Sequence, residues 1–292
     1  MNILGTGLSG LVGSRLMELL KDSMTFQNLS LETGVDITNK NNVDSYFATS
    51  DADWVFHLAA YTDVQGAEKE KDLKEESVAW KVNVLATEYI VENCKKFKKN
   101  LLYIDTDYAF DGTLGSYSEN STPNPLGWYA KTKSEGANRV LSLGQKGLVI
   151  RISNPFRANP VGKKDFVHKM LERLQQGLTL SAPTDSVFVP TFIDDLAQAV
   201  QALVPAQSSG IYHVVGAKEL SPYEAAMHIA TVFGCDVSLV QKTTFDEMFM
   251  NRAPAPRMAH LTQEKILNLG IHPHTFEEGL IEVKSQESTA NV

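Results

Sequence analysis

Short apolar runs alternate along the first two thirds of the chain with longer segments whose apolar positions recur every three or four residues. The short runs span residues 2–7, 53–61, 100–110 and 147–153, and the longer segments span residues 12–22, 78–97 and 128–143. A short apolar run is typical of a buried strand, and the wider spacing is typical of a helix with one face in the core. The alternation predicts βαβ units, and therefore an α/β fold with a mostly parallel sheet.

The regular alternation stops after residue 153. Residues 154–165 contain two prolines and no periodicity, which is typical of a loop that lines a site. Helices are expected at 166–177, 191–204, 221–234 and 261–270, a strand at 210–216, and a frayed end at 285–292. We expect residues 1–153 and 187–216 to form the sheet domain, and residues 154–186 and 217–292 to form a smaller C-terminal lobe.

A glycine-rich loop, TGLSGLVG, lies between the first expected strand and the first expected helix. Gly7, Gly10 and Gly13 are spaced so that the backbone can turn sharply and approach a pyrophosphate at the helix N-terminus, beside Leu11 and Val12. This context predicts a doubly wound, Rossmann-type domain that binds a dinucleotide. A merely tight turn between strand and helix is the alternative interpretation.

The far end of the dinucleotide is expected near the segment GVDITN, where Asp36 and Ile37 could hold an adenine. No acidic residue that would favour NAD is obvious at the end of the second strand, and no arginine for a 2′-phosphate is obvious either. The residues therefore leave the choice between NAD and NADP open.

Charge and composition narrow the possible partners. The net charge is −8, which argues against nucleic acid or an anionic membrane as the main partner. The two cysteines, Cys94 and Cys235, have no ligand-spaced Cys or His neighbour, and no metal-ligand spacing stands out elsewhere. The chain begins with a strand pattern and has no run of 18 apolar residues. We expect a cytoplasmic protein with reduced cysteines and no metal site.

The segment WYAKTKSEGA places Tyr129 four residues before Lys133, on one face of an expected helix. A phenol and an ammonium at this spacing are either a surface coincidence or an acid–base pair, and the spacing alone is a weak signal. His57 lies in an expected buried strand and is interpreted as a core residue. His168 is interpreted as a surface residue of an amphipathic helix.

Together these motifs resemble the extended short-chain dehydrogenase/reductase superfamily, and most closely its dTDP-4-dehydrorhamnose reductase family. TGLSGLVG is similar to the TGxxGxxG loop of the superfamily, DTDYAFDG (105–112) to the family's STDYVFDG, and YAKTK to its tyrosine–lysine motif. HLAAYTDVQGAE resembles the segment that passes beneath the nicotinamide, which implies cofactor contacts for Ala59, Ala60 and Tyr61. The helix that follows places Asn83 in the position expected of another cofactor residue.

The resemblance implies a ketone reductase that uses NADP or NAD. Tyr129 would be the general acid, and Lys133 would favour the phenolate and bind the nicotinamide ribose. Thr106 would donate a hydrogen bond to the carbonyl oxygen. The smaller lobe would then bind a nucleotide sugar, and the helices at 78–97 and 128–143 could pair in a homodimer.

The residues expected to contact the sugar nucleotide are Asp107, Tyr108, Phe110, Asn154, Arg252 and Arg257. Here the chain departs from the family pattern. Asp105 stands where the family usually has serine, Asn154 where an aromatic residue is common, and Ala255 where an arginine is expected near the diphosphate. Gly5 also replaces a branched residue in the first strand, at some expected cost in stability.

These departures leave three functions open. The first is an NAD(P)H-dependent reductase of a 4-keto-6-deoxy nucleotide sugar. The second is a nucleotide-sugar epimerase or dehydratase. The third is a regulatory subunit with the same fold, like the beta subunit of methionine adenosyltransferase.

Overall fold

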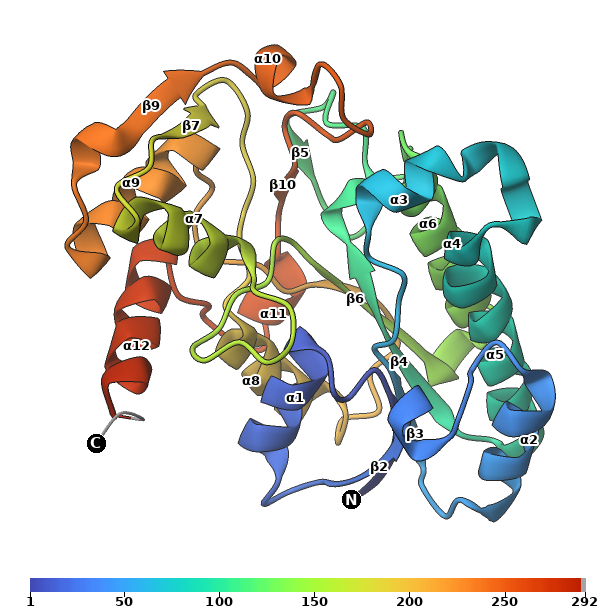
Figure 1. The fold of residues 1–292 in the computed structure, drawn as a ribbon. Coiled ribbons are helices and arrows are strands. Elements are labelled where there is room, and N and C mark those ends of the chain that lie inside the picture. Colours follow the sequence, from blue (N-terminus) through green and yellow to red (C-terminus); the bar gives the residue numbers. More distant parts are fainter. Residues whose placement is uncertain (290–292) are drawn as a thin grey trace.

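The computed structural model describes residues 1–289, and its larger lobe is built on a six-stranded sheet (Figure 1). The strands follow the order β2-β1-β3-β4-β6-β8, and every neighbouring pair is parallel. The chain runs from β1 outward to β2 and then crosses to β3, so the switch point of this doubly wound fold lies between β1 and β3. The expected α/β class is confirmed. The strands are β1 (Asn2–Thr6), β2 (Thr25–Leu29), β3 (Trp54–His57), β4 (Asn100–Thr106), β6 (Gly147–Ile152) and β8 (Gly210–His213).

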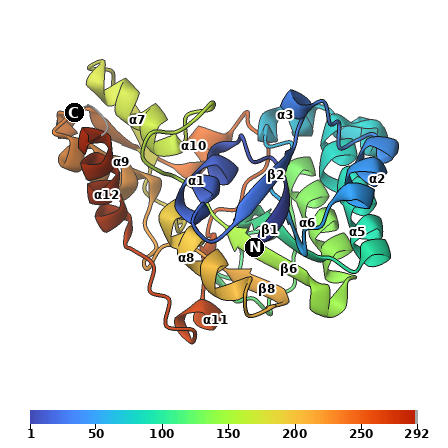
Figure 2. The same cartoon turned by 90° about the horizontal axis from the view of Figure 1, so that it is seen from below.

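Helices cover both faces of this sheet (Figure 2). One face packs against α1 (Leu11–Leu20) and α8 (Ile193–Leu203). The other packs against α2 (Lys40–Thr49), α5 (Ala86–Phe97) and α6 (Trp128–Leu141). Because both faces are buried, the strands have nearly continuous apolar sequences, which is the pattern that made them recognisable.

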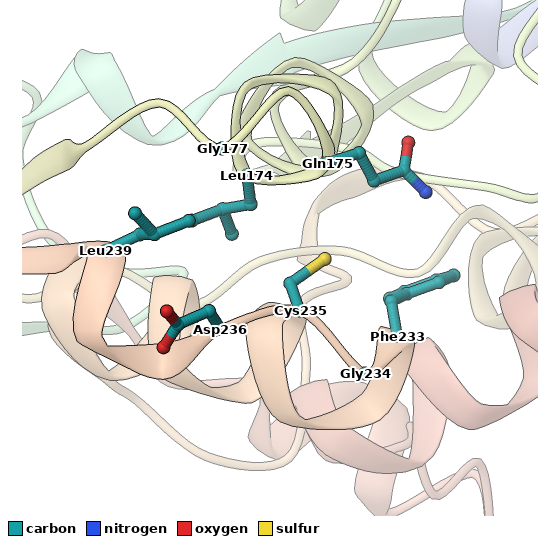
Figure 3. A pocket seen from close by; sticks show the side chains of 8 residues that line it. All are labelled: Leu174, Gln175, Gly177, Phe233, Gly234, Cys235, Asp236 and Leu239. Atoms are coloured by element: carbon teal, nitrogen blue, oxygen red, sulfur yellow. The ribbon is translucent and has the colours of Figure 1, made fainter.

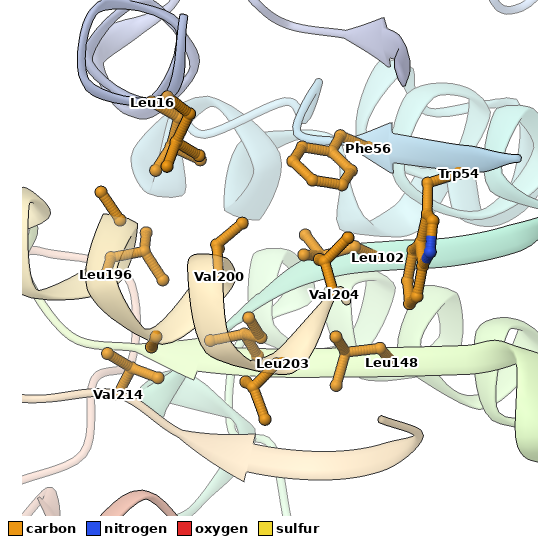
Figure 4. Close-up of a cluster of buried hydrophobic side chains, with 14 of the residues drawn as sticks. Leu16, Trp54, Phe56, Leu102, Leu148, Leu196, Val200, Leu203, Val204 and Val214 are labelled. Atoms are coloured by element: carbon orange, nitrogen blue, oxygen red, sulfur yellow. The ribbon is translucent and has the colours of Figure 1, made fainter. Parts of the chain in front are cut away.

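The core between α8 and the sheet shows how the apolar spacing of the helix becomes packing. Leu196, Val200 and Leu203 lie three or four residues apart and point together toward the strands (Figure 4). They meet Phe56 from β3 and Leu102 from β4, among other buried side chains.

The smaller lobe has its own apolar cluster, packed around three helices and a pair of parallel strands. These elements are α7 (Phe166–Gln175), α9 (Pro222–Phe233), α12 (Phe276–Thr289), β7 (Leu180–Pro183) and β9 (Val240–Thr243). The expected capping box of α9 is present: the Ser221 hydroxyl accepts from the Glu224 N–H, and the Glu224 carboxylate accepts from the Ser221 N–H. The remaining short elements are α3 (Val64–Lys69), α4 (Val78–Trp80), β5 (Ser116–Tyr117), α10 (Phe245–Phe249), β10 (His260–Leu261) and α11 (Glu264–Leu267).

Several expected elements differ in extent. The strand expected at 53–61 ends at His57, the strand expected at 210–216 ends at His213, and the helix expected at 261–270 spans only Glu264–Leu267. The helix expected at 78–97 is interrupted by a π-helical turn at Lys81–Leu85, and the strand expected at 100–110 ends at Thr106. There the Thr106 hydroxyl accepts from the Tyr108 N–H and starts a short 3₁₀ turn instead. The frayed end expected at 285–292 is wrong for residues 285–289, which continue α12, while residues 290–292 lie outside the described part of the chain.

The lack of a side chain at Gly5 leaves no open space in the first strand. The fully buried Leu8 side chain fills the space beside Gly5, because a Cβ at Gly5 would lie 2.6 Å from Leu8 Cδ1. The strands β5, β7, β9 and β10 were not expected, because they have little apolar periodicity, and for the same reason no bounds were given for the second strand, β2. Within residues 1–289, no helix is long and apolar enough to cross a membrane.

The close approach of α6 to the sheet depends on Gly136. A Cβ at this position would lie 2.4 Å from the Asn83 carbonyl oxygen and 2.6 Å from the Tyr103 phenol oxygen. Neither neighbour can move freely, because Asn83 lies in the π-helical turn and Tyr103 is fully buried in β4. Glycine therefore sets how near the helix that carries Tyr129 and Lys133 can come to the end of β4.

Gly136→Ala should lower the free energy of unfolding by about 1–3 kcal/mol, because overpacking outweighs the better helix propensity of alanine. Chemical denaturation measures the difference. Asn138→Ala is the matched control, since Asn138 is exposed on the same helix and this change should be neutral or slightly stabilising. Equal stability of Gly136→Ala and Asn138→Ala would contradict the proposed contact.

Candidate active site

A cavity of about 860 Å³ runs along the carboxyl ends of the sheet strands. Parallel α/β sheets place their ligands at this edge, and the cavity spans the switch point between β1 and β3. Its lining residues come from the glycine loop, the segments after β2, β3, β4 and β6, and α6 and α7. Those used below are Gly7, Gly10–Gly13, Ser30–Glu32, Asp36, Ile37, Ala59, Ala60, Asp105–Tyr108, Tyr129, Lys133, Asn154, Val161–Asp165 and Lys169.

The three glycines of the first loop serve different purposes. Gly7 has φ +68°, and a Cβ there would lie 2.4 Å from the Ala59 N atom. A Cβ on Gly13 would lie 2.4 Å from the Gly7 carbonyl oxygen, so this glycine lets α1 pack against the turn. Gly10 has only one neighbour within 4 Å of such a Cβ, and it caps α1 without a side-chain hydrogen bond. The first N–H groups of α1 are thus open toward the cavity, as binding of a pyrophosphate requires.

The segments after β2 and β3 line the neighbouring parts of the cavity. Asp36 and Ile37 are there as expected, and Asp36 Oδ1 accepts from the Thr38 N–H at 2.9 Å. Ser30 and Glu32 also line the cavity but were missed from the sequence. Knowing that β2 ends at Leu29 would have pointed to these residues. The sequence of β2 has no clear apolar pattern, so this strand end could not be located.

The structure separates the four cofactor residues that were expected after β3 and on the helix that follows it. Ala59 and Ala60 line the cavity, whereas Tyr61 and Asn83 do not. The buried Asn83 side chain accepts from the Tyr61 N–H at 2.8 Å and donates to the Tyr61 carbonyl at 3.2 Å. It also donates to the Thr132 hydroxyl at 3.0 Å. Asn83 therefore holds the segment after β3 against α6 and has no donor left over for a ligand.

Thr106, Tyr129 and Lys133 meet in the cavity. Thr106 ends β4, and Tyr129 and Lys133 lie on successive turns of α6. The Thr106 hydroxyl lies close enough to the Tyr129 phenol to lower the pKa of that phenol. Lys133 Nζ donates to the Ile104 carbonyl at 2.6 Å and lies 3.9 Å from the Tyr103 ring centroid. The spacing on the helix thus brings the phenol and the ammonium to the end of the same strand.

Burial controls the protonation of both groups. Burial raises the pKa of Tyr129 above its ordinary value, although the hydrogen bond from Thr106 acts in the opposite direction. The effect of Lys133 on the Tyr129 phenol stays a prediction, because burial is the largest influence on this pKa in the chain without ligands. Burial lowers the pKa of Lys133 to about 8, and the Asp105 carboxylate opposes this change.

Asp105 forms a buried ion pair on the floor of the site. Its Oδ2 accepts from Arg151 Nε at 2.9 Å, and the two side chains are 0% and 2% exposed. The register of β4 and β6 places the two residues directly opposite each other. Asp105 Oδ1 and one Arg151 guanidinium nitrogen are buried without a hydrogen-bond partner. The pair therefore supplies a counter-charge near Lys133 that the family serine could not.

Asp107 is a second buried carboxyl group in the site. It accepts from the Ser153 hydroxyl at 2.6 Å and from the Thr106 hydroxyl at 3.1 Å. Burial raises the pKa of Asp107 to about 6, although these hydrogen bonds lower it. The Thr106 hydroxyl thus lies between Asp107 and the Tyr129 phenol.

The other expected substrate residues lie at different depths. Tyr108 and Asn154 line the cavity, and the Tyr108 ring meets the Tyr129 ring edge to face at 5.9 Å. Phe110 does not line it, because its fully buried ring stacks on Tyr117 at 4.3 Å. Its apolar ring is accounted for by core packing alone.

Arg252 and Arg257 both lie outside the cavity lining, but their surroundings differ. Arg257 forms an ion pair with Asp185 and lies 3.6 Å from Asp246. Arg252 is exposed over the Phe249 ring, and its charge acts on Tyr108 at the cavity. Among residues 1–289, Arg252 has no ion pair with an acidic side chain. Of the two, Arg252 is the guanidinium that is available to a ligand.

The irregular loop at 154–165 lines the cavity, as expected from its sequence. Lys163, Lys164 and Lys169 line the cavity from this loop and from α7 and were missed, since basic residues in a loop are usually solvated. The loop is fixed to α1 by the buried Arg157, which donates to the Ser14 hydroxyl at 2.8 Å and to the Glu18 carboxylate at 2.7 Å.

The two histidines interpreted from the sequence differ in outcome. His57 is fully buried between the hydroxyls of Thr6 (2.7 Å) and Thr87 (2.9 Å), and burial lowers its pKa to about 3. Its interpretation as a core residue is confirmed. The surface interpretation of His168 is wrong, because its ring lies between Asp165 and Glu287 at 2.8 Å from each, with a side chain only 12% exposed.

A second hollow, of about 580 Å³, lies in the smaller lobe between the C-terminal ends of α7 and α9 (Figure 3). It is lined by Leu174, Phe233, Leu239 and Cys235 together with polar groups such as Gln175 and Asp236. The Asp236 carboxylate at its edge accepts from the Ser238 N–H and so caps a turn. Within residues 1–289, no cluster of His, Cys, Asp and Glu could hold a metal ion. The first cavity is therefore the candidate site.

Replacing Asp107 should change the pH dependence of stability. The pKa of Asp107 in the folded chain lies above its ordinary value of 3.8, so the stability from this group is full below that value and is lost as the pH rises through about 6. Asp107→Asn should therefore gain about 2–3 kcal/mol relative to wild type between about pH 4 and pH 8. Denaturation at both pH values measures this change.

Asp111→Asn is a control of opposite sign. Hydrogen bonds from Tyr117 and Thr113 lower the pKa of Asp111, so its contribution to stability is lost as the pH falls. This variant should be most destabilised relative to wild type at neutral pH. The same pH trend in both variants would show that the burial of Asp107 is not responsible.

The comparisons with known proteins agree with this geometry. A family model described as the RmlD substrate binding domain matches residues 1–288. A dTDP-4-dehydrorhamnose reductase from Aggregatibacter actinomycetemcomitans is 30% identical over 302 residues, covering 97% of this chain and 98% of that protein. The methionine adenosyltransferase 2 subunit beta of Xenopus tropicalis is 30% identical over 228 residues, covering 74% and 67%.

A solved structure gives the same result in three dimensions. The crystal structure of dTDP-4-dehydrorhamnose reductase from Bacillus anthracis, in complex with NADP, superposes with a TM-score of 0.87 at 27% identity. The match covers 98% of this chain and 99% of that one. Since the family model and the two reductase relatives extend over nearly the whole chain, this protein belongs to the RmlD substrate-binding domain family.

Proposed function

We propose that this chain is an NAD(P)H-dependent reductase that converts the 4-keto group of a 6-deoxy nucleotide sugar to a hydroxyl group, in the manner of dTDP-4-dehydrorhamnose reductase. The observation that carries the proposal is the meeting of Thr106, Tyr129 and Lys133 in a cavity that also contains the glycine loop. The relatives named as reductases of this type support it.

Reduction needs a hydride on carbon and a proton on oxygen. A bound dinucleotide would supply the hydride. The residues that would hold the dinucleotide line the cavity and are Gly10, Val12, Asp36 and Lys133. Tyr129 supplies the proton. Because burial keeps its phenol protonated at neutral pH, Tyr129 is ready to act as the general acid in the direction of reduction.

Thr106 and Lys133 position the reacting groups. A carbonyl oxygen placed beside both hydroxyls would accept a hydrogen bond from Tyr129, and a second from Thr106 once the Thr106 proton turns away from the Asp107 carboxylate. Lys133 is anchored to the backbone of β4 through the Ile104 carbonyl and still faces the cavity. Its charge would stabilise the phenolate that forms after proton transfer.

The sugar nucleotide would extend from this centre toward the smaller lobe. Tyr108 and Asn154 lie beside Tyr129 in the cavity, and both can donate hydrogen bonds to sugar hydroxyls. Arg252 is the guanidinium we assign to the diphosphate, because Arg257 is already paired with Asp185. A cytoplasmic location and pairing of two copies through α5 and α6 belong to the same proposal.

A regulatory subunit is the second candidate, favoured by the similarity to a methionine adenosyltransferase beta subunit. Such a subunit would bind the dinucleotide without turnover. The drifted substrate residues, such as Ala255, are compatible with this role, but the intact Thr106, Tyr129 and Lys133 are explained only by catalysis.

The test is oxidation of NADH and NADPH in the presence of a panel of 4-keto-6-deoxy nucleotide sugars. Tyr129→Phe should lower kcat by about 10²–10⁴-fold, as expected when a general acid is lost. Tyr89→Phe is the matched control, because Tyr89 lies on α5 outside the cavity and should leave kcat unchanged. Dinucleotide binding without oxidation by any sugar would refute the reductase and favour the regulatory subunit.

The pH dependence of the reductase should reveal the role of Asp105. Because Lys133 must be protonated to stabilise the phenolate, kcat should fall as the pH rises through about 8. Asp105→Asn removes the carboxylate that raises the pKa of Lys133, so the fall should occur at lower pH. The charged and titratable groups around Lys133 and Asp105 are His57, Tyr103, Asp107, Tyr108, Tyr129, Arg151 and His213.

The double variant Asp105→Asn/Arg151→Gln separates charge from structure. It removes both charges and still allows a hydrogen bond between the two amides, so it should fold better than Asp105→Asn alone. If the pair acts only by supporting the fold, the double variant should have the wild-type pH profile. A shift of the basic limb to lower pH in both variants would identify the charge as the cause.

A further inference from the structure

Tyr129 lies in the first turn of α6, before the contacts that anchor the rest of this helix. Lys133 is one turn further on, where its ammonium donates to the Ile104 carbonyl, and Gly136 packs against the sheet almost one turn after that. The first turn of a helix has unpaired backbone N–H groups and tends to fray. The position of the phenol therefore depends on what holds the start of α6.

The sequence of α6 supplies no capping side chain. Gly127 is the N-cap and has no side chain, and the first turn contains no acidic residue. The Gly127 carbonyl accepts from the Lys131 N–H at 3.0 Å, which is the ordinary first bond of the helix. A side chain that accepts from the N–H groups of the first turn has to come from elsewhere in the fold.

Glu68 on α3 is that side chain. α3 packs against α6 (Figure 1), and Glu68 Oε2 accepts from the Trp128 N–H at 2.9 Å. The other oxygen, Oε1, accepts from Lys71 Nζ at 3.1 Å. Burial acts to raise the pKa of Glu68, but the hydrogen bonds from Trp128 and Lys71 outweigh it and lower this pKa. Glu68 is therefore a carboxylate at neutral pH, which is the favoured charge at a helix N-terminus.

α3 is itself fixed to the segment that follows β3. The Asp63 carboxylate caps α3 by accepting from the Gly66 N–H at 3.0 Å, and Ala67 is fully buried. A Cβ at Gly66 would lie 2.4 Å from the Tyr61 phenol oxygen, so α3 packs directly against Tyr61. Glu68 therefore comes from a helix whose position is set by the end of β3.

Gly127 makes room for the Glu68 carboxylate. A Cβ at Gly127 would lie 3.3 Å from Glu68 Oε2 and 3.3 Å from the Pro254 carbonyl oxygen. A serine or aspartate, the usual N-cap residues, would crowd both oxygens. The Trp128 side chain has its own anchor, since the indole Nε1 donates to Ser77 Oγ at 2.9 Å. Residue 128 is thus held through its backbone by α3 and through its side chain by Ser77.

We propose that Glu68 is a positioning residue, which caps α6 from a different helix and so keeps the Tyr129 phenol at the end of β4. This inference rests on the proposed reductase, in which Tyr129 is the general acid. Glu68 does not line the cavity, so its effect passes through the backbone of Trp128. A shift of about 1 Å at a reacting group can lower a rate by about 10²-fold, so a contact outside the cavity can control catalysis.

The test compares Glu68→Ala with Glu68→Gln, using the sugar that the wild type reduces. Glu68→Ala removes the acceptor and should lower kcat by about 10- to 10²-fold, with the dissociation constant of the dinucleotide unchanged. Glu68→Gln keeps an acceptor oxygen and should retain most of the wild-type kcat. Hydrogen exchange of the backbone amides at 128–131 should be faster in Glu68→Ala and close to wild type in Glu68→Gln.

A double-mutant cycle with Tyr129→Phe separates positioning of the phenol from general support of the fold. If Glu68 acts through the phenol, adding Glu68→Ala to Tyr129→Phe should change kcat by less than about twofold. A cap that only supports the fold would lower kcat by the same factor in both backgrounds. That result would overturn the inference.

Glu70→Ala is the matched control. Glu70 Oε2 accepts from the Val78 N–H at 2.8 Å, so this variant removes an equivalent contact from the start of α4 and should leave kcat unchanged. Wild-type kcat or wild-type hydrogen exchange in Glu68→Ala would refute the role of Glu68 and leave the proposed reductase intact. A wild-type chain that reduces no sugar of the panel would overturn both.

Discussion

The close contact between α6 and β4 is the constraint on which the candidate site depends. Gly136 lets the helix approach until the Tyr103 hydroxyl reaches the Lys133 carbonyl and Lys133 Nζ reaches the Ile104 carbonyl. A lysine so held has little conformational freedom left, and the phenol one turn earlier is fixed with it. The distance between Tyr129 and the end of β4 thus follows from helix–sheet packing.

Burial decides the charges in this site. It raises the pKa of the Tyr129 phenol and lowers that of the Lys133 ammonium, so both neutral forms are favoured. Asp105 is the counterweight, and its carboxylate is paired with Arg151 across the β4–β6 register. A buried ion pair is seldom a gain in stability over apolar packing. The benefit to the site is that the Asp105 carboxylate of this pair raises the pKa of Lys133.

The two lobes are joined by the same residues that shape the cavity. Arg157 links the loop after β6 to α1, the helix whose N-terminus faces the cavity. The Asp165 carboxylate accepts from the Arg157 N–H and caps α7 by accepting from the His168 N–H. The segment that carries the cavity lysines is therefore anchored to the dinucleotide side at one end and to the smaller lobe at the other. Its position depends on both lobes.

The sequence alone predicted most of the larger lobe, because strands buried on both faces have continuous apolar runs and their helices have a regular apolar spacing. It failed for β5, β7, β9 and β10 and for the bounds of β2, which show no clear apolar period. It also failed for the π-helical turn at Lys81–Leu85, which does not change the apolar spacing. It also placed the strand end beyond Thr106, since a side-chain cap is a local competition that apolar patterns do not record.

For the site, the resemblance of the motifs to the reductase family selected Thr106, Tyr129, Lys133 and the glycine loop, and the structure brings them into one cavity. The roles of residues distant in sequence were decided only by the tertiary structure. Asn83 and Phe110 were expected to touch ligands and instead pack inside the fold, while Glu32 and Lys163 face the cavity. Which side chain meets the cavity depends on where strands end and how lobes dock, and the chain's local pattern does not contain that information.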